Sequence, residues 1–271
     1  MVAGQDGSSR EQEKTQIMGI LNITPDSFSD GGQYNQLEVA IRRARELVAE
    51  GADIIDVGGE STRPGAEKVD KDEELSRVIP IIEALVQEVD VPLSIDTYKA
   101  EVAERALQAG ASIINDVWGA KADPEMAKVA AKNGATIVLM HNRNDREYAS
   151  FMDDVRSDLR ESIAICKKAG VTDEQIILDP GVGFAKSYEQ NLEVIRRLDE
   201  ITKLGYPVLL GVSRKSFISK ALDLPVEDRL EGTGAANCLG MSKGASIIRV
   251  HDIKEMSRMA KMMDALLGKG Q

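Results

Sequence analysis

Eight short apolar runs recur along this chain, each followed by a stretch long enough for one helix. This alternation predicts parallel strands with helical crossovers. Eight such units in 271 residues fit a single (β/α)₈ barrel, although an open doubly wound sheet stays possible because periodicity does not reveal closure. The predicted strands are Ile17–Leu21, Ile54–Val57, Leu93–Ile95, Ile113–Val117, Thr136–Met140, Ile176–Leu178, Val208–Leu210 and Ile247–Val250.

Nearly every predicted strand closes on a polar residue. Buried parallel strands favour aliphatic residues throughout, so charge at one end needs a reason. In a (β/α)₈ barrel the carboxyl ends of the strands carry the active site, and we expect it there. The residues are Asn22, Asp56 with Glu60, Asp96, Asn115, His141, Asp179, Ser213-Arg214-Lys215, and Arg249 with His251.

Local signals mark where helices begin and end. Six predicted helix-to-strand junctions contain glycine, which tolerates the left-handed conformation of a helix C-cap. These glycines are Gly51, Gly110, Gly134, Gly170, Gly205 and Gly244. At the remaining junction Pro92 is expected to stop the helix. Asp123-Pro124 predicts an N-cap followed by a first helical residue, and Ser187–Gln190 predicts a capping box.

Composition narrows the function classes. A net charge of −11 argues against a nucleic-acid surface, and no run reaches the roughly 18 apolar residues of a membrane span. The two cysteines give no disulfide framework. Residues 1–16 are polar without a secretory core, so we expect an N-terminal tail, a barrel domain over 17–267 and a cytoplasmic location.

Cations also gather at the predicted carboxyl ends. Arg63, Lys215, Arg249 and His251 follow strands two, seven and eight, and loops after strands seven and eight commonly bind phosphate in such barrels. Arginine suits phosphate because its fork bonds through two N–H groups. A surface ion pair is the preferred interpretation of Arg214. For the two histidines, a site role is favoured at His251, whereas His141 could equally bond a loop carbonyl.

The acidic and amide residues suggest the shape of a ligand. Asp96, Asn115 and Asp179 come from three strands and could converge on one flat, nitrogen-rich ring, because carboxylates accept from adjacent N–H groups and asparagine offers both a donor and an acceptor. The alternative is a polar network that only fixes loops. No zinc spacing or complete phosphate-loop motif is present. Mg²⁺ held mainly by substrate phosphate, with Asn22 as a ligand, would fit.

Several stretches resemble, in order, the signatures of the dihydropteroate synthase family, especially its Bacillus-like bacterial members. The resemblance covers about residues 17–267, and its first two motifs are long and specific. The matching stretches are Asn22–Gly32, Gly58–Gly65, Ser94–Thr97, Ile114–Asp116, Asp179–Phe184, Ser213–Phe217 and Arg249–Asp252.

This resemblance implies a homodimeric transferase that joins p-aminobenzoate to 6-hydroxymethyl-7,8-dihydropterin diphosphate with Mg²⁺. It implies pterin contacts from Asp96, Asn115, Asp179 and Lys215, and diphosphate contacts from Asn22, Thr62, Arg63, Arg249 and His251. It implies p-aminobenzoate contacts from Phe28, Thr62, Pro64, Phe184, Lys215 and Ser216. The catalytic roles fall to Lys215, Asp96, Asp30 and Arg63, with Phe28 and Asp30 on a loop that closes over the site.

Three other functions remain possible at this point. A class I aldolase would use Lys215 as a Schiff-base nucleophile, but the anion-binding charge around it argues against this. A pterin-dependent methyltransferase could use the same barrel, although the loop at residues 24–32 and the Arg249-Val250-His251 segment favour a diphosphate substrate. A non-catalytic barrel would bind a pterin or phosphate without turnover.

Overall fold

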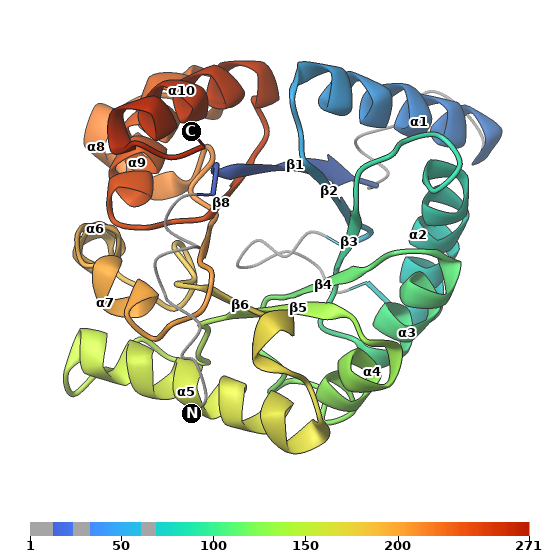
Figure 1. Cartoon of the computed structure of the whole chain (residues 1–271), viewed down its shortest axis with the longest axis horizontal. Helices are drawn as coiled ribbons and strands as arrows, with labels where there is room; N and C mark the ends of the chain where they lie inside the picture. Colours follow the sequence, from blue (N-terminus) through green and yellow to red (C-terminus); the bar gives the residue numbers. More distant parts are fainter. Residues whose placement is uncertain (1–12, 24–32, 61–68, 271) are drawn as a thin grey trace, which may run out of the picture.

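The computed structural model describes residues 13–23, 33–60 and 69–270. Its strands form a central ring and its helices an outer ring around them (Figure 1). Within these residues no helix combines the length and apolar composition needed to cross a membrane. The strands are β1 (Gln16–Asn22), β2 (Ile54–Gly58), β3 (Leu93–Asp96), β4 (Ile113–Asp116), β5 (Thr136–Met140), β6 (Ile176–Asp179), β7 (Leu209–Leu210) and β8 (Ile247–Val250).

All neighbouring strands pair in parallel, in the order β6-β5-β4-β3-β2-β1-β8-β7. The ring closes between β6 and β7 through a parallel bridge of Leu178 with Val208, where the Leu178 amide donates to the Pro207 carbonyl over 2.9 Å. The (β/α)₈ barrel is therefore confirmed, and the open sheet is excluded.

The helices pack their apolar sides on the outside of this ring. They are α1 (Gln33–Glu50), α2 (Lys71–Leu85), α3 (Ala100–Ala109), α4 (Met126–Asn133), α5 (Phe151–Ala169), α6 (Tyr188–Arg196), α7 (Asp199–Thr202), α8 (Ser216–Leu222), α9 (Leu230–Ser242) and α10 (Ile253–Leu267), with 3₁₀ turns η3 (Asp173–Gln175) and η4 (Val226–Asp228). The main core lies between helices and strands, and a smaller apolar cluster fills the barrel interior.

Most of the predicted boundary signals are confirmed. All six junction glycines have positive φ, between 62° and 116°, which a side chain would disfavour. Ser187 accepts from the Gln190 amide in a complete capping box that opens α6. Cys166 is buried in α5, and both cysteines are free thiols.

Two boundary predictions are wrong. The helix before β3 ends at Leu85, where the Val86 amide still bonds the Ile82 carbonyl, so Pro92 opens the strand and does not stop the helix. The α4 helix begins at Met126. Asp123 uses one carboxylate oxygen for the Glu125 amide and the other for the Ala100 amide at the start of α3, so its cap is shared between two helices.

The N-terminal edge of the barrel lies slightly before the predicted one. β1 begins at Gln16, and Thr15 is buried where its amide and hydroxyl both donate to Asp264 over 2.8 Å. The predicted tail over residues 1–16 falls mainly on residues outside the described ones.

Candidate active site

The barrel interior is apolar at one level and polar at the next. Side chains alternate across a strand, so every second residue points inward. The inner apolar cluster consists of Met18, Ile54, Ile113, Val138, Ile177, Leu209 and Ile247. Two residues further along four of these strands stand Asp56, Asn115, Asp179 and Arg249, and β3 contributes Asp96 at the matching register. We call Asp56, Asp96, Asn115, Asp179 and Arg249 the strand-end ring.

Arg249 ties the strand-end ring together. Its Nε donates to Asp56 Oδ2 over 2.6 Å, and its terminal Nη2 donates to Asp96 Oδ2 over 2.7 Å. Asn115 Nδ2 donates to the same Asp56 oxygen over 3.0 Å. Burial acts to lower the pKa of Arg249, but the carboxylates of Asp56 and Asp96 outweigh it and raise that pKa. The guanidinium therefore remains charged inside the barrel.

Asp96 stands out among the acids of the ring. Burial raises the pKa of Asp96 to about 7, with Arg249 opposing the shift and Asp56 adding to it. The second carboxylate oxygens of Asp96 and Asp56 are buried and have no hydrogen-bond partner among the described residues. A buried acceptor without a donor costs free energy unless a ligand or water supplies one, so these oxygens are suited to ligand N–H groups.

Asp179 and Lys215 face each other at the other side of the ring. Burial raises the pKa of Asp179 while Lys215 opposes the shift, and Asp179 Oδ1 accepts from the Gly181 amide over 2.7 Å. Burial lowers the pKa of Lys215 to about 8, with Asp179 opposing the shift. Lys215 is the N-cap residue of α8, and its ammonium donates to the Val182 carbonyl.

Glycines keep this centre open. A Cβ on Gly211 would lie 3.8 Å from Lys215 Nζ and 4.0 Å from Asp179 Oδ2. A Cβ on Gly58 would lie 3.6 Å both from Asn22 Oδ1 and from Asp96 Cβ. Asn22 therefore borders the strand-end ring at its β1–β2 edge.

The remaining predicted residues lie around this centre. The Lys215 ammonium lies 5.0 Å from the centre of the Phe184 ring, and Ser216 is the exposed first residue of α8. His251 Nδ1 lies 2.9 Å from the Ser213 hydroxyl, at the ends of β8 and β7. Phe28, Asp30, Thr62, Arg63 and Pro64 lie outside the described residues.

Two of the predicted strand-end residues have structural partners. Arg214 bonds Asp252 through both Nε and a terminal nitrogen, which confirms the ion-pair interpretation. Glu60 pairs with Lys99, which also holds Glu74 over 2.5 Å. Both carboxylates are almost fully buried, so this cluster fixes the ends of β2 and α2.

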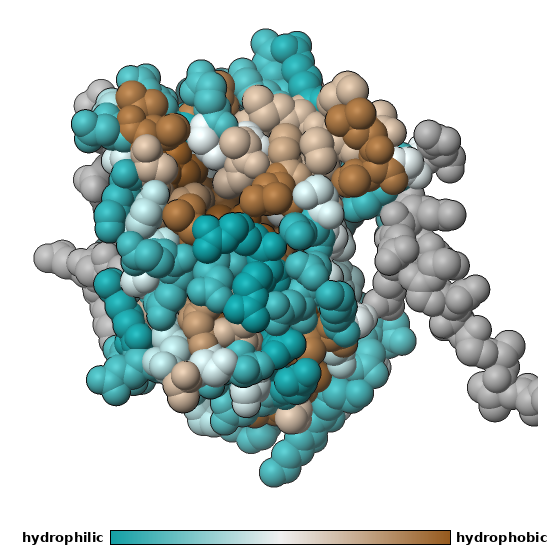
Figure 2. Space-filling view, turned by 90° about the vertical axis from the view of Figure 1, so that its left-hand side faces the viewer, coloured by the Kyte–Doolittle hydropathy of each residue, from teal (hydrophilic) through white to brown (hydrophobic). Residues whose placement is uncertain are grey.

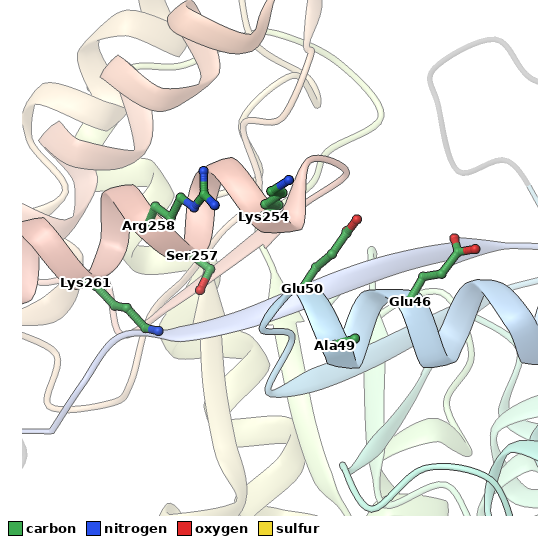
Figure 3. A pocket seen from close by; sticks show the side chains of 7 residues that line it. All are labelled: Glu46, Ala49, Glu50, Lys254, Ser257, Arg258 and Lys261. Atoms are coloured by element: carbon green, nitrogen blue, oxygen red, sulfur yellow. The ribbon is translucent and has the colours of Figure 1, made fainter.

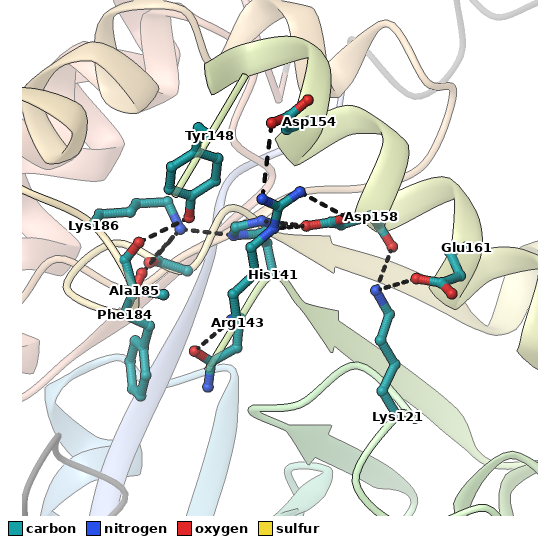
Figure 4. A network of polar contacts seen from close by, with 12 residues as sticks. Lys121, His141, Arg143, Tyr148, Asp154, Asp158, Glu161, Phe184, Ala185 and Lys186 are labelled. Atoms are coloured by element: carbon teal, nitrogen blue, oxygen red, sulfur yellow. Dashed lines mark hydrogen bonds and ion pairs between the residues drawn. The ribbon is translucent and has the colours of Figure 1, made fainter. Parts of the chain in front are cut away.

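His141 is buried in a separate network. Its Nε2 lies 3.0 Å from Asp158 Oδ2, and its Nδ1 lies 2.8 Å from the ammonium of Lys186 (Figure 4). Arg143 also bonds Asp158. The sequence left His141 open between a site role and a bond to a loop carbonyl, and the ring nitrogens in fact bond the side chains of Asp158 and Lys186.

Sequence reasoning missed the roles of Asp56 and Lys186. The strand-end pattern includes Asp56 but assigns it no role, although pairing of Asp56 with Ser94 in the β2–β3 register places it beside the ring. Lys186 follows the Asp179–Phe184 motif on a loop, and no spacing rule points to its burial at 4% exposure.

A shallow groove of about 460 Å³ lies elsewhere, on the outer wall between α1 and α10 (Figure 3). Glu46 and Glu50 face Lys254, Arg258 and Lys261 across it. It has none of the strand-end ring residues, so we do not assign the chemistry to it.

Comparisons with known proteins agree with this geometry. Residues 18–251 match the model of the "Pterin binding enzyme" family. The dihydropteroate synthase of Bacillus subtilis is 61% identical over 259 residues, 96% of this chain and 91% of that protein. The Clostridium difficile dihydropteroate synthase, solved in the presence of pteroic acid, superposes with a TM-score of 0.93 at 53% identity, covering 95% of this chain and 98% of that one. The Yersinia pestis dihydropteroate synthase in a sulfonamide drug complex gives 0.88 at 39% identity, covering 98% of each chain.

Proposed function

The chain belongs to the dihydropteroate synthases, a family of pterin-binding enzymes, and from this premise we propose how its barrel mouth performs the reaction. It is a transferase of folate biosynthesis that moves an alkyl group other than methyl. It joins p-aminobenzoate to 6-hydroxymethyl-7,8-dihydropterin diphosphate, which gives 7,8-dihydropteroate and diphosphate. The aldolase and methyltransferase alternatives are not favoured by these relatives.

The observation that carries the proposal is the convergence of five polar side chains from five strands on one barrel mouth. Asp96, Asn115 and Asp179 would hold the pterin, because a 2-amino-pyrimidinone edge presents adjacent N–H donors that carboxylates accept. The unpartnered, buried oxygen of Asp96 supports this role. Lys215 would donate to a ring nitrogen or carbonyl from beside Asp179.

The diphosphate would lie at the β1, β2 and β8 side of the mouth. Arg249 and His251 supply donors there, and Asn22 borders Asp96 across Gly58. Thr62 and Arg63 would complete the set from the loop after β2. A cation close to the leaving oxygens stabilises the charge that develops as diphosphate departs.

Mg²⁺ fits this arrangement as an ion held mainly by the substrate. Among residues 13–23, 33–60 and 69–270 no cluster of three acidic, cysteine or histidine residues could cage a metal alone. Mg²⁺ commonly takes one or two protein oxygens plus substrate phosphates, and Asn22 would lend one amide oxygen. When bound, the ion would neutralise diphosphate charge.

The p-aminobenzoate would approach between Lys215, Phe184 and Ser216 on the β6 and β7 side. Phe28, Thr62 and Pro64 would complete its surroundings. Phe184 offers an aromatic face near the ammonium of Lys215. Because the family includes a solved sulfonamide complex, we expect sulfonamides to compete with p-aminobenzoate for this position.

We propose that departure of diphosphate leaves a cation on the pterin methylene carbon. The electron-rich pterin and the carboxylates of Asp96 and Asp179 would stabilise it. The neutral aniline nitrogen would attack without a strong base, and it would then release one proton to the departing diphosphate or to water. Lys215 would orient the pterin, while Arg63 and Asp30 would act from the loops. Excluding water matters because water would trap the cation.

A homodimer is proposed from an exposed apolar surface. Figure 2 shows hydrophobic surface gathered over the upper part of one side, where α8, α9 and α10 lie in Figure 1. The exposed large hydrophobic residues of these helices and of η4 are Leu222, Val226, Leu239, Met262, Leu266 and Leu267, with Leu266 67% exposed. Large exposed apolar patches commonly mark protein interfaces, and a two-fold axis covers one patch with its copy.

Sedimentation at micromolar concentration tests the dimer. Wild type should sediment as two chains, and Met262→Lys with Leu266→Lys should sediment as one. A wild-type monomer would contradict the proposal. A cytoplasmic location stays a proposal that rests on the composition of the sequence.

Turnover tests the function itself. Protein, Mg²⁺, the dihydropterin diphosphate and p-aminobenzoate should release diphosphate and form dihydropteroate in equal amounts. Asp179→Asn should lower the rate sharply, whereas Asp90→Asn, an exposed aspartate before the amino end of β3 and so at the opposite end of the barrel from the site, should not. Pterin binding without turnover would favour the non-catalytic barrel, and trapping of Lys215 by borohydride would favour the aldolase.

A further inference from the structure

Lys186 is a buried cation to which no function is yet assigned. It lies on the loop between β6 and α6 and is only 4% exposed, and the acidic groups that act on its charge are Asp179 of the strand-end ring and Asp158 of α5. Lysine is almost never fully buried unless its charge is compensated. The surroundings of its ammonium therefore indicate what the residue does.

The ammonium of Lys186 meets three acceptors. They are His141 Nδ1 at 2.8 Å, the Gly181 carbonyl at 3.0 Å and the Phe184 carbonyl at 3.2 Å. An ammonium has three N–H donors and no acceptor, so all three hydrogen bonds can form together. While Lys186 is charged, His141 Nδ1 must accept, and the proton of the neutral ring stands on Nε2.

That tautomer continues the network outward. His141 Nε2 can then donate to Asp158 Oδ2, 3.0 Å away, and Asp158 is held from its other side by Arg143 (Figure 4). The path runs from the cation Arg143 through the carboxylate of Asp158 and the neutral imidazole to the cation Lys186. The bond to Asp158 fixes which ring nitrogen of the imidazole carries the proton, and so which nitrogen accepts from Lys186. The network joins the loops after β5 and β6 to α5.

The loop over residues 180–186 is the part that this network holds. Lys186 binds the carbonyls of Gly181 and Phe184, and Tyr148 donates to the Ala185 carbonyl over 2.8 Å. From the opposite side Lys215 donates to the Val182 carbonyl. Four carbonyls of one short loop are thus bonded by side chains.

The close packing of the loop leaves little tolerance. Gly181 has φ of 67°, and a Cβ there would lie 1.9 Å from the His141 carbonyl oxygen. The loop carries Phe184 and contacts Lys215, two groups proposed to border p-aminobenzoate. Of the four proposed pterin groups, Asp179 accepts from the Gly181 amide and Lys215 donates to the Val182 carbonyl. Asp96 and Asn115 have no hydrogen bond to this loop, so they should hold the pterin even when the loop is loosened.

We propose that Lys186 is a positioning residue for p-aminobenzoate: its three hydrogen bonds hold the 180–186 loop so that Phe184 and the Val182 carbonyl face Lys215. This inference rests on the proposed role of Phe184. Preorganisation of this kind lowers the cost of ordering a loop when the substrate binds.

The protonation behaviour of the network agrees with this role. Burial lowers the pKa of Lys186 to about 7; Asp179 and Asp158 oppose the shift, and Lys215 and Arg143 add to it. Burial also lowers the pKa of His141 to about 4, with the charge of Lys186 contributing and Asp158 opposing. Between pH values of about 4 and about 7 the pair is thus a charged lysine and a neutral histidine.

Lys186→Met tests the proposal, because methionine keeps the length and removes the donors. We expect the KM for p-aminobenzoate to rise at least tenfold, while the calorimetric Kd of 6-hydroxymethylpterin changes less than threefold. Lys167→Met, an exposed lysine paired with Asp173 on the outside of α5, should keep both values. Equal losses for both ligands, or no loss at all, would overturn the proposal.

Nitrogen NMR of histidine tests the hydrogen bond between Lys186 and His141 directly. The chain has two histidines, so a His251→Gln sample assigns the signals. In wild type at pH 6.5, His141 should carry its proton on Nε2, and in Lys186→Met its pKa should rise from about 4. A wild-type proton on Nδ1 would contradict the bond to Lys186.

Two further variants keep the test decisive. Tyr148→Phe removes only the hydrogen bond to the Ala185 carbonyl and should raise the same KM about threefold even if Lys186→Met does not fold; an unchanged KM would count against the proposal. Phe184→Ala separates the two claims, because an unchanged KM there would refute the proposed role of Phe184 and leave the His141 readout standing.

Discussion

Replacing Asp56 by asparagine should move the pH dependence of pterin binding to lower pH. Asp56 shares the guanidinium of Arg249 with Asp96, and its negative charge helps to raise the pKa of Asp96 to about 7. If ionised Asp96 accepts pterin N–H donors, wild-type affinity should fall as pH drops through 7, because the carboxylate must lose its proton to bind.

The size of the change follows from electrostatics. Removing a like charge several ångströms away is worth ~2 kcal/mol at an effective dielectric constant of ~20. One pKa unit corresponds to about 1.4 kcal/mol, so the pKa of Asp96 should fall by on the order of one unit. Arg249 would then bond only Asp96 of the two carboxylates, and its undivided charge would lower the pKa of Asp96 further. The pH below which pterin affinity falls, which we call the acidic limb of binding, should therefore move from about 7 to a value roughly one pH unit lower.

Calorimetry of 6-hydroxymethylpterin between pH 5 and pH 8 measures this limb. Asp90→Asn, an exposed aspartate, serves as the matched control and should keep the wild-type profile. Urea unfolding of each variant checks that the barrel remains folded across the range. An acidic limb that stays near 7 in Asp56→Asn, or moves upward, would refute the assignment of that limb to Asp96.

Other predictions concern single contacts. Asp179→Asn should weaken pterin binding roughly tenfold or more, since a charge-assisted hydrogen bond is worth about 1.5–3 kcal/mol; calorimetry checks it. Arg249→Lys keeps the charge but not the fork, so the KM for the diphosphate substrate should rise more than the Kd of a pterin without phosphates. Gly181→Ala should lower the free energy of unfolding by at least ~2 kcal/mol, measured in urea, because of its left-handed φ and the 1.9 Å approach to the His141 carbonyl. Burial lowers the pKa of His141 from 6.5 to about 4, so its contribution to the free energy of unfolding is complete above pH 6.5 and is lost as pH falls through 4. Urea unfolding at several pH values should show this loss, on the order of 3 kcal/mol, and the loss should be smaller in His141→Gln.

The strand pattern made much of the fold predictable. The apolar runs gave β5 and β8 with the bounds that the structure has, and the other strands differ by one or two residues. Gly51 and Gly244 adopt the positive φ that a helix C-cap favours. Barrel closure was not predictable, because it depends on the single bridge of Leu178 with Val208, which leaves no periodic signal.

The site was predictable from the sequence where the strand register alone decides which side chains point into the barrel. Asp96 and Asp179 end their strands, and Asn115 lies one residue before the end of β4. All three occupy inward positions, so their convergence followed from the alternation of side chains. Lys186 could not be found this way, because its burial depends on a loop conformation that folds two carbonyls of its own loop and the distant His141 around its ammonium. The start of α4 was mispredicted for a similar reason, since Asp123 also caps α3.

A crystal structure of the protein with pteroate tests the central claim most directly, because this one molecule carries both the pterin and the p-aminobenzoate groups. We expect the pterin ring inside the barrel mouth, with hydrogen bonds to Asp96, Asn115 and Asp179, and the benzoate beside Phe184 and Ser216. Pteroate bound in the groove between α1 and α10, or at the mouth without contact to Asp96 and Asp179, would contradict the account.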